Sequence, residues 1–314
     1  MGKLISEKYA AWQAECEERF QQLKKNEEEL NRIFIDIYGL QDELTPVVAD
    51  KDVTVHRVFD SKDDVPESMK GSNYVRTMRD EIVSLISYAV GCMFGRYSLD
   101  VEGLAYAGGE WDGSKYKTFL PDEDNCIPVT DEEYFKDDIV GRFVEFVRTV
   151  YGSDTLEENL DFVANALAGK GSTSREVIRN YFLNDFIKDH IKTYQKRPIY
   201  WMFDSGKQNG FKALVYMHRW NADTTGNVRV EYLHRVQRVY ESEIARMQDT
   251  IDNSSNAREV SAAQKRKDKL TKQLKVLNGV TEQMKAEDQM KWVGLMNSIR
   301  HSAEEVVLRD LIYA

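Results

Sequence analysis

The feature that most constrains the fold is a pair of long runs with helical hydrophobic spacing, separated by a short polar segment. In the first run, apolar residues recur in steps of three and four, at Leu233, Val236, Tyr240, Ile244, Met247 and Ile251. The polar segment 252–256 interrupts this spacing, which resumes at Val260, Ala263, Leu270, Leu274, Leu277, Val280 and Met284. Such steps place side chains on one face of an α-helix. The sequence therefore predicts an antiparallel helical hairpin over residues 228–284 with coiled-coil-like packing.

The upstream part of the chain also has mainly helical patterns. A long helix is predicted over residues 7–38, with Gly39 as its C-terminal cap and Pro46 beyond its end. Further helices are expected over residues 73–94, 130–151, 156–167 and 174–194. Thr130 and Glu133 have the spacing of a capping box, which predicts that the second of these four helices starts there. Residues 45–72 are expected to form a loop with a short strand at 53–58, and residues 98–125 are expected to form an extended surface segment.

One stretch has the pattern of β-structure. Residues 199–203 and 211–217 are rich in aromatic and β-branched residues, and a glycine-containing turn separates them. The expected fold class is therefore mainly α with a small β-hairpin, comprising a helical domain and a C-terminal helical hairpin. The expected segments are 1–72 (long helix and loop), 73–225 (mixed helical domain with the β-hairpin) and 226–314 (helical hairpin and C-terminal helix).

Charge is unevenly distributed along the chain. The formal net charge of −10 argues against tight, independent binding of nucleic acid by the chain as a whole. Residues 100–161 contain 5 Lys/Arg and 17 Asp/Glu, whereas residues 170–240 contain 13 Lys/Arg and 6 Asp/Glu. Two interpretations are open: one face of the molecule is basic, or the two regions neutralise each other.

Candidate phosphate-binding residues lie around the predicted β-hairpin, because basic side chains contact the phosphates of DNA. Neighbouring aromatic residues such as Trp201 and Phe203 could stack on bases, but the simpler interpretation is that they belong to the core. The candidate DNA-binding residues are Lys192, Lys196, Arg197, Lys207, Lys212, Arg219 and Arg235.

No catalytic or metal-binding constellation is recognisable in the sequence. Gly108 and Gly109 do not follow a buried parallel strand, so a turn is expected there rather than a cofactor-binding loop. His190 and His218 flank the hairpin without a third metal ligand, and the three cysteines form no CxxC pair. Neither a membrane-spanning run nor a secretory signal is apparent, which favours a cytoplasmic location and no membrane partner.

Three blocks of sequence resemble a known family. They are ELNRIFIDIYGLQDELTP at residues 29–46, SYAVGCMFGRYSLD at residues 87–100, and KRPIYWMF at residues 196–203 followed by ALVYMHR at residues 213–219. In this order they resemble the adenine-specific DNA methyltransferases of bacteriophage-exclusion (BREX) systems, the PglX family. The first block is also similar to the region that follows the methyltransferase core in single-chain type II restriction–modification enzymes. The resemblance covers roughly residues 27–284, whereas residues 287–314 depart from the family pattern.

The resemblance implies a parent enzyme that transfers a methyl group from S-adenosylmethionine to adenine N6 in DNA. The Asn-Pro-Pro-Tyr-type motif and cofactor-binding glycines of such enzymes are absent from this chain. We therefore expect a non-catalytic C-terminal portion that binds no cofactor and recognises or positions duplex DNA. Its other expected partners are the methyltransferase core and further defence-system proteins. The alternative is a helical scaffold that binds protein partners rather than DNA, and its expected sign is an uncovered apolar helix face.

Overall fold

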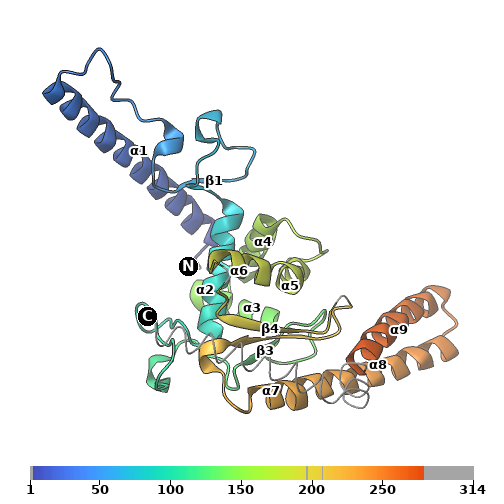
Figure 1. The fold of residues 1–314 in the computed structure, drawn as a ribbon. Helices are drawn as coiled ribbons and strands as arrows, with labels where there is room; N and C mark the ends of the chain where they lie inside the picture. The colour runs from blue at the N-terminus through green and yellow to red at the C-terminus, as the bar shows by residue number, and fades with distance from the viewer. Residues whose placement is uncertain (1–2, 196, 207, 279–314) are drawn as a thin grey trace, which may run out of the picture. The chain divides into compact units, whose positions relative to one another are not determined.

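The structure is a computed structural model that describes residues 3–278 except Lys196 and Lys207. The fold is mainly α with short strands, as the sequence predicts (Figure 1). The chain forms two units, one made of Met1–Ser87 with Val147–Gly169 and the other of Tyr88–Phe146 with Lys170–Ala314. Among the described residues, no helix has the length and apolar character needed to cross a membrane.

Helix α1 (Ile5–Tyr38) confirms the predicted long N-terminal helix. It ends where the sequence indicates, because Gly39 adopts a left-handed conformation with φ of 65°. The amide of Gly39 donates to the carbonyl of Asp36 at 3.3 Å, and the amide of Leu40 donates to the carbonyl of Ile35 at 3.0 Å. These bonds satisfy carbonyl groups that the last helical turn leaves without partners.

The first unit also contains a two-stranded parallel sheet and helix α4 (Leu156–Leu167), whose bounds match the prediction. Strand β1 (Arg57–Phe59) pairs with β2 (Val75–Thr77). The predicted strand at residues 53–58 overlaps only the first part of β1. The predicted helix start at residue 73 is wrong, because residues 75–77 pair as a strand and α2 (Met78–Met93) begins after them. Short 3-10 turns occupy Asp50–Asp52 and Glu67–Met69.

Helix α3 (Ile139–Tyr151) starts nine residues later than predicted at Thr130. The Thr130 hydroxyl donates to the carbonyl of Glu132 at 2.6 Å, so it does not cap a helix. Instead, the fully buried Asp138 carboxylate accepts from the amide of Val140 at 3.0 Å. The capping-box prediction is wrong because Asp138 provides the N-terminal cap.

The second unit contains a three-stranded antiparallel sheet in the order β3–β5–β4. Strands β4 (Tyr200–Asp204) and β5 (Lys212–Tyr216) confirm the predicted hairpin, with Tyr200 opposite Tyr216. Strand β3 (Cys126–Pro128) was not predicted, and its three residues are buried. The sequence before it, 98–125, is largely irregular with a 3-10 turn at Gly113–Lys115, but Tyr116 and Phe119 are buried, so it is not purely a surface segment.

Helices cover both faces of this sheet. On one face lie α5 (Ser174–Asn184) and α6 (Phe186–Thr193), which are two helices rather than the single predicted one because the chain breaks at Asp185. Phe186 of α6 contacts Tyr200 with ring centroids 6.4 Å apart. On the other face, Ala213 and Val215 pack into a cluster with residues of the C-terminal hairpin.

The C-terminal hairpin confirms the prediction from the hydrophobic spacing. Helices α8 (His234–Asn253) and α9 (Ala257–Asn278) lie side by side (Figure 1). They follow a 3-10 turn at Met217–Arg219, the short helix α7 (Thr224–Asn227) and a π-helical segment, Val228–Leu233. The predicted inward residues Val236, Tyr240, Ala263, Leu270 and Leu277 are buried. The predicted positions Val280 and Met284 lie outside the described residues.

Candidate nucleic-acid interface

Lys212, one of the candidate DNA-binding residues, has its charge satisfied inside the protein. Alternate residues of β5 point to opposite faces of the sheet, and Lys212 points away from the face that carries Ala213. Its ammonium group donates to the carbonyl of Leu183 at 2.8 Å and lies 3.0 Å from the Asp204 carboxylate. Because Lys212 is buried, a phosphate could reach its ammonium group only if these bonds were broken.

Arg219 likewise holds parts of the protein together. Its guanidinium group donates to the carbonyls of Asp122 at 2.7 Å and Glu123 at 3.0 Å. It also lies over the Trp111 ring, with its central carbon 4.4 Å from the ring centroid. Burial lowers the pKa of the Arg219 guanidinium group, although the group remains charged at neutral pH. The structure therefore gives Arg219 a role in anchoring the segment before β3.

Three other candidates remain exposed. Lys192 lies in the last turn of α6, and Arg197 lies in the connection from α6 to β4. Arg235 is in the first turn of α8, where its guanidinium group covers the Phe135 ring at 5.4 Å. Lys192 and Arg197 thus belong to one short stretch, whereas Arg235 comes from another element. The candidates Lys196 and Lys207 lie outside the described residues.

Most of the neighbouring aromatic side chains pack within the protein. Tyr200, Phe211 and Tyr216 are buried. Trp201 and Phe203 are half-buried, and Phe203 stacks against Trp220 with centroids 6.0 Å apart. The three buried rings are therefore packing residues and present no free face to a nucleic-acid base.

The histidines flanking the hairpin have separate structural environments. The Nε2 atom of buried His190 accepts from the Ile199 amide at 3.1 Å, and burial lowers the pKa of His190 to about 4. His218 contacts the carbonyl of Ala107 through Nδ1 at 2.5 Å. Within the described ranges, no group of three or more His, Cys, Asp or Glu side chains has the geometry to hold a metal ion.

Gly108 and Gly109 have the geometry of an open turn. Both have positive φ, 117° and 83°, and an added Cβ at either position would meet no atom within 4 Å. They lie in an irregular segment rather than between a buried parallel strand and a helix. These glycines therefore fit a turn and not the close backbone approach that a cofactor needs.

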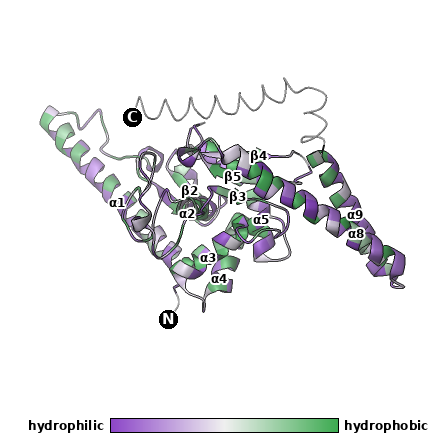
Figure 2. Ribbon diagram, turned by 90° about the horizontal axis from the view of Figure 1, so that it is seen from below, coloured by the Kyte–Doolittle hydropathy of each residue, from purple (hydrophilic) through white to green (hydrophobic). Residues whose placement is uncertain are grey.

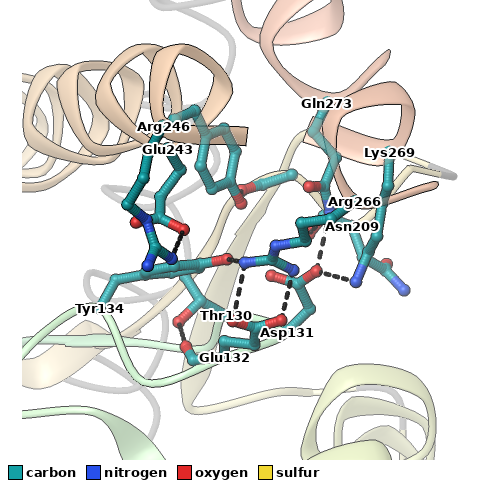
Figure 3. Close-up of polar contacts among 12 residues, drawn as sticks. Thr130, Asp131, Glu132, Tyr134, Asn209, Glu243, Arg246, Arg266, Lys269 and Gln273 are labelled. Carbon is teal, nitrogen blue, oxygen red and sulfur yellow. Dashed lines mark hydrogen bonds and ion pairs between the residues drawn. The ribbon is translucent and has the colours of Figure 1, made fainter. Parts of the chain in front are cut away.

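Sequence reasoning missed a polar network that anchors the helical hairpin to the sheet (Figure 3). Arg266 of α9 forms an ion pair with Glu132. The Nη2 atom of Arg266 donates to Oε2 of Glu132 at 2.7 Å and to the Tyr134 hydroxyl at 2.8 Å. Lys269 pairs with Asp131, which also accepts from the fully buried Gln273 amide at 3.0 Å. The acidic run near residue 131 and the basic run near residue 267 are both visible in the sequence. Nothing in their spacing indicates that they meet.

The comparisons with known proteins place the chain among segments of adenine-specific methyltransferases. It is 48% identical over 269 residues to "Adenine-specific methyltransferase PglX" of Lacticaseibacillus casei (strain Zhang), an alignment that covers 85% of this chain and 21% of the relative. It is 35% identical over 298 residues to "Adenine-specific methyltransferase BrxX" of Escherichia coli O9:H4 (strain HS), covering 90% of this chain and 24% of the relative. The resemblance to PglX is therefore confirmed. The chain spans between a fifth and a quarter of the length of these relatives.

The C-terminal part has a second similarity. Residues 220–312 match the family described as "Transposon-encoded protein TnpV". This match includes α8 and α9 and extends over residues 287–312, where the sequence predicts a departure from the PglX pattern.

Proposed function

We propose that this chain is a non-catalytic, C-terminal segment of an adenine-N6-specific DNA methyltransferase of a phage-defence or restriction–modification system, and that it helps to position duplex DNA. The observation that carries the proposal is the 48% identity to an adenine-specific methyltransferase across 85% of the chain. In this proposal S-adenosylmethionine binds to a separate methyltransferase core, which also acts on the adenine. The core and other defence proteins are the expected protein partners.

The exposed basic side chains support a positioning role. Lys192 in the last turn of α6 and Arg197 in the connection to β4 are exposed, and phosphate oxygens could approach them without breaking an internal ion pair. Such contacts fix the register of a protein on DNA but do not read its sequence. Lys196 and Lys207 remain part of the proposal, whereas Lys212 and Arg219 would support this surface from within. Arg235 would contact DNA from α8.

The test is binding of the chain to duplex DNA, measured by fluorescence anisotropy between about 50 and 200 mM salt. Each lost phosphate contact should reduce the slope of log affinity against log salt by about 0.9, so Lys192→Gln with Arg197→Gln should reduce it by about 1.8. The matched control is Lys25→Gln with Lys62→Gln, which removes two exposed lysines of the other unit. No binding at the lowest salt, or equal slopes for both double variants, would refute a DNA-positioning role for this surface.

A second function is favoured by one specific observation, an uncovered apolar row near the end of α1. Leu30, Ile33, Phe34 and Ile37 are 54%, 45%, 55% and 69% exposed. Their spacing of three and four residues places them on one helix face, and Figure 2 shows hydrophobic residues along α1 up to this end. An exposed apolar face of this kind is typical of a protein-binding surface. The chain would then act as a helical scaffold, with the methyltransferase core as its partner.

A further inference from the structure

Helix α9 is the more basic of the two helices of the hairpin, α8 and α9. It contains seven Lys/Arg residues and two Asp/Glu residues, although the whole chain has a net charge of −10. In α8, by contrast, three arginines are accompanied by four acidic residues. The positive charge of the hairpin is therefore concentrated on α9.

The basic residues of α9 divide into two groups by what they contact. Arg266 and Lys269 form ion pairs with Glu132 and Asp131, and Lys267 donates to Gln248. Arg258, Lys265, Lys272 and Lys275 are exposed, and no ion pair joins any of them to another described residue. In the first group, Arg266 and Lys269 attach the hairpin to the segment after β3, and Lys267 joins α9 to α8. The second group presents its charge to solvent.

Three members of the exposed group form a straight row. Arg258, Lys265 and Lys272 are seven residues apart, so they lie on nearly the same face at intervals of about 10 Å. The buried residues Ala263, Leu270 and Leu277 repeat with the same period, five positions later. Five residues correspond to a rotation of about 140° around the helix. The row therefore faces almost directly away from the hairpin core and spans about 21 Å.

Among the described residues, no acidic side chain of the hairpin forms an ion pair with the row. Asp268 accepts from Gln264 at 2.9 Å, and Glu259 accepts from the Ser254 hydroxyl at 2.7 Å. On α8, Asp249 and Asp252 accept hydrogen bonds from side chains of the same helix. These four carboxylates thus accept hydrogen bonds from side chains other than the three residues of the row.

Hydrogen bonds also join the hairpin to the turn between β4 and β5. Gln273 donates to the carbonyl of Gln208 at 3.1 Å in the turn between β4 and β5, and the Tyr240 hydroxyl donates to the carbonyl of Gly210 at 2.6 Å. Figure 3 shows Gln273 together with Arg266 and Lys269 around Asp131. Figure 2 shows that the opposite end, where α8 meets α9, is hydrophilic.

We propose that the α9 row, Arg258, Lys265 and Lys272, binds the phosphate backbone of duplex DNA. This is a second contact surface, separate from the end of α6, and it rests on the proposed function that the chain acts on DNA. A straight helix with evenly spaced cations on one face matches a polyanion that is itself a straight rod. Contacts from the row to phosphate oxygens contribute affinity without sequence preference.

The test compares the salt dependence of DNA binding for two triple variants of the full chain. Arg258→Gln, Lys265→Gln and Lys272→Gln remove the row, whereas Lys25→Gln, Lys62→Gln and Lys117→Gln remove three exposed charges elsewhere. With a duplex of about 30 base pairs, the row variant should lose about 2.7 from the salt slope and tenfold or more in affinity at about 50 mM salt. The control should bind like the unchanged chain, and thermal unfolding of both variants should be unaltered.

The outcomes separate this proposal from the one on which it rests. If the unchanged chain does not bind DNA at the lowest salt, both proposals are refuted. If it binds, and the Lys192 and Arg197 variant weakens binding while the row variant matches its control, only the α9 proposal is refuted. A lower salt slope for the row variant than for its control supports the α9 proposal.

Discussion

The buried pair of Asp138 and Arg179 allows a quantitative prediction about the stability of the second unit. The Asp138 carboxylate is fully buried and accepts two bonds from the Arg179 guanidinium group, at 2.7 and 2.8 Å. Arg179 also donates to the carbonyl of Thr130 at 2.9 Å, and Asp138 caps α3 through the amide of Val140. One carboxylate thus starts α3, joins it to α5 and fixes the segment before it.

Asp138→Ala should lower the free energy of unfolding by about 4 kcal/mol. Removing one partner of a buried ion pair typically costs about 3–5 kcal/mol because the other charge remains desolvated, and losing a helix cap costs about 1 kcal/mol. The two costs overlap, since the same carboxylate serves both purposes. Asp138→Asn should cost less than Asp138→Ala, because asparagine caps a helix about as well as aspartate.

Urea denaturation, monitored by circular dichroism, measures these differences. The control is the double variant Asp138→Leu with Arg179→Met, which replaces both charges by apolar groups and should be more stable than either single variant. A loss below about 1 kcal/mol for Asp138→Ala would contradict the assigned role of the pair. Additive losses in the double variant would show that the two side chains do not interact.

Two further predictions concern pH and the apolar row of α1. Burial, with Asp124 nearby, raises the pKa of Asp122 to about 8, so the folded state retains a proton that the unfolded state loses. The free energy of unfolding should therefore fall as pH rises from about 4 to 8, and urea denaturation should show a weaker fall for Asp122→Asn. Phe34→Asp with Ile37→Asp should leave thermal unfolding unchanged but reduce co-purification with the remaining part of the L. casei relative. Equal co-purification would contradict the scaffold function.

The sequence was sufficient for elements whose pattern is long and local. Helices α1, α4 and the α8–α9 hairpin have repeated apolar spacing over several turns, and the glycine after α1 marks its end. In each case the signal lies within the element itself. The same local signal was misleading at Thr130, where a capping-box spacing is present but the chain is held in an irregular conformation by Arg179. That contact joins residues 49 positions apart and leaves no periodic trace.

The short strands could not be predicted for a related reason. Strands β1, β2 and β3 each contain only three residues, too few for an alternating pattern to be distinguished from chance. Strand β3 forms because Cys126 pairs opposite Val215, a residue far along the chain. Its stability therefore depends on a partner that the local sequence does not specify.

The candidate interface shows the limit of residue type as evidence for function. Lys192 and Lys212 have the same side chain in different environments. Lys192 is exposed, whereas Lys212 is buried against Asp204 and the carbonyl of Leu183. What distinguishes them is strand alternation, which turns Lys212 toward α5. The apolar spacing of α9 predicts a helix but does not indicate a DNA-binding surface. Nevertheless, α9 carries exposed lysines, as the region around the β-hairpin does. A cation is available to DNA only where the fold leaves it exposed and without an internal partner, and this selects the α9 row over Lys212 and Arg219.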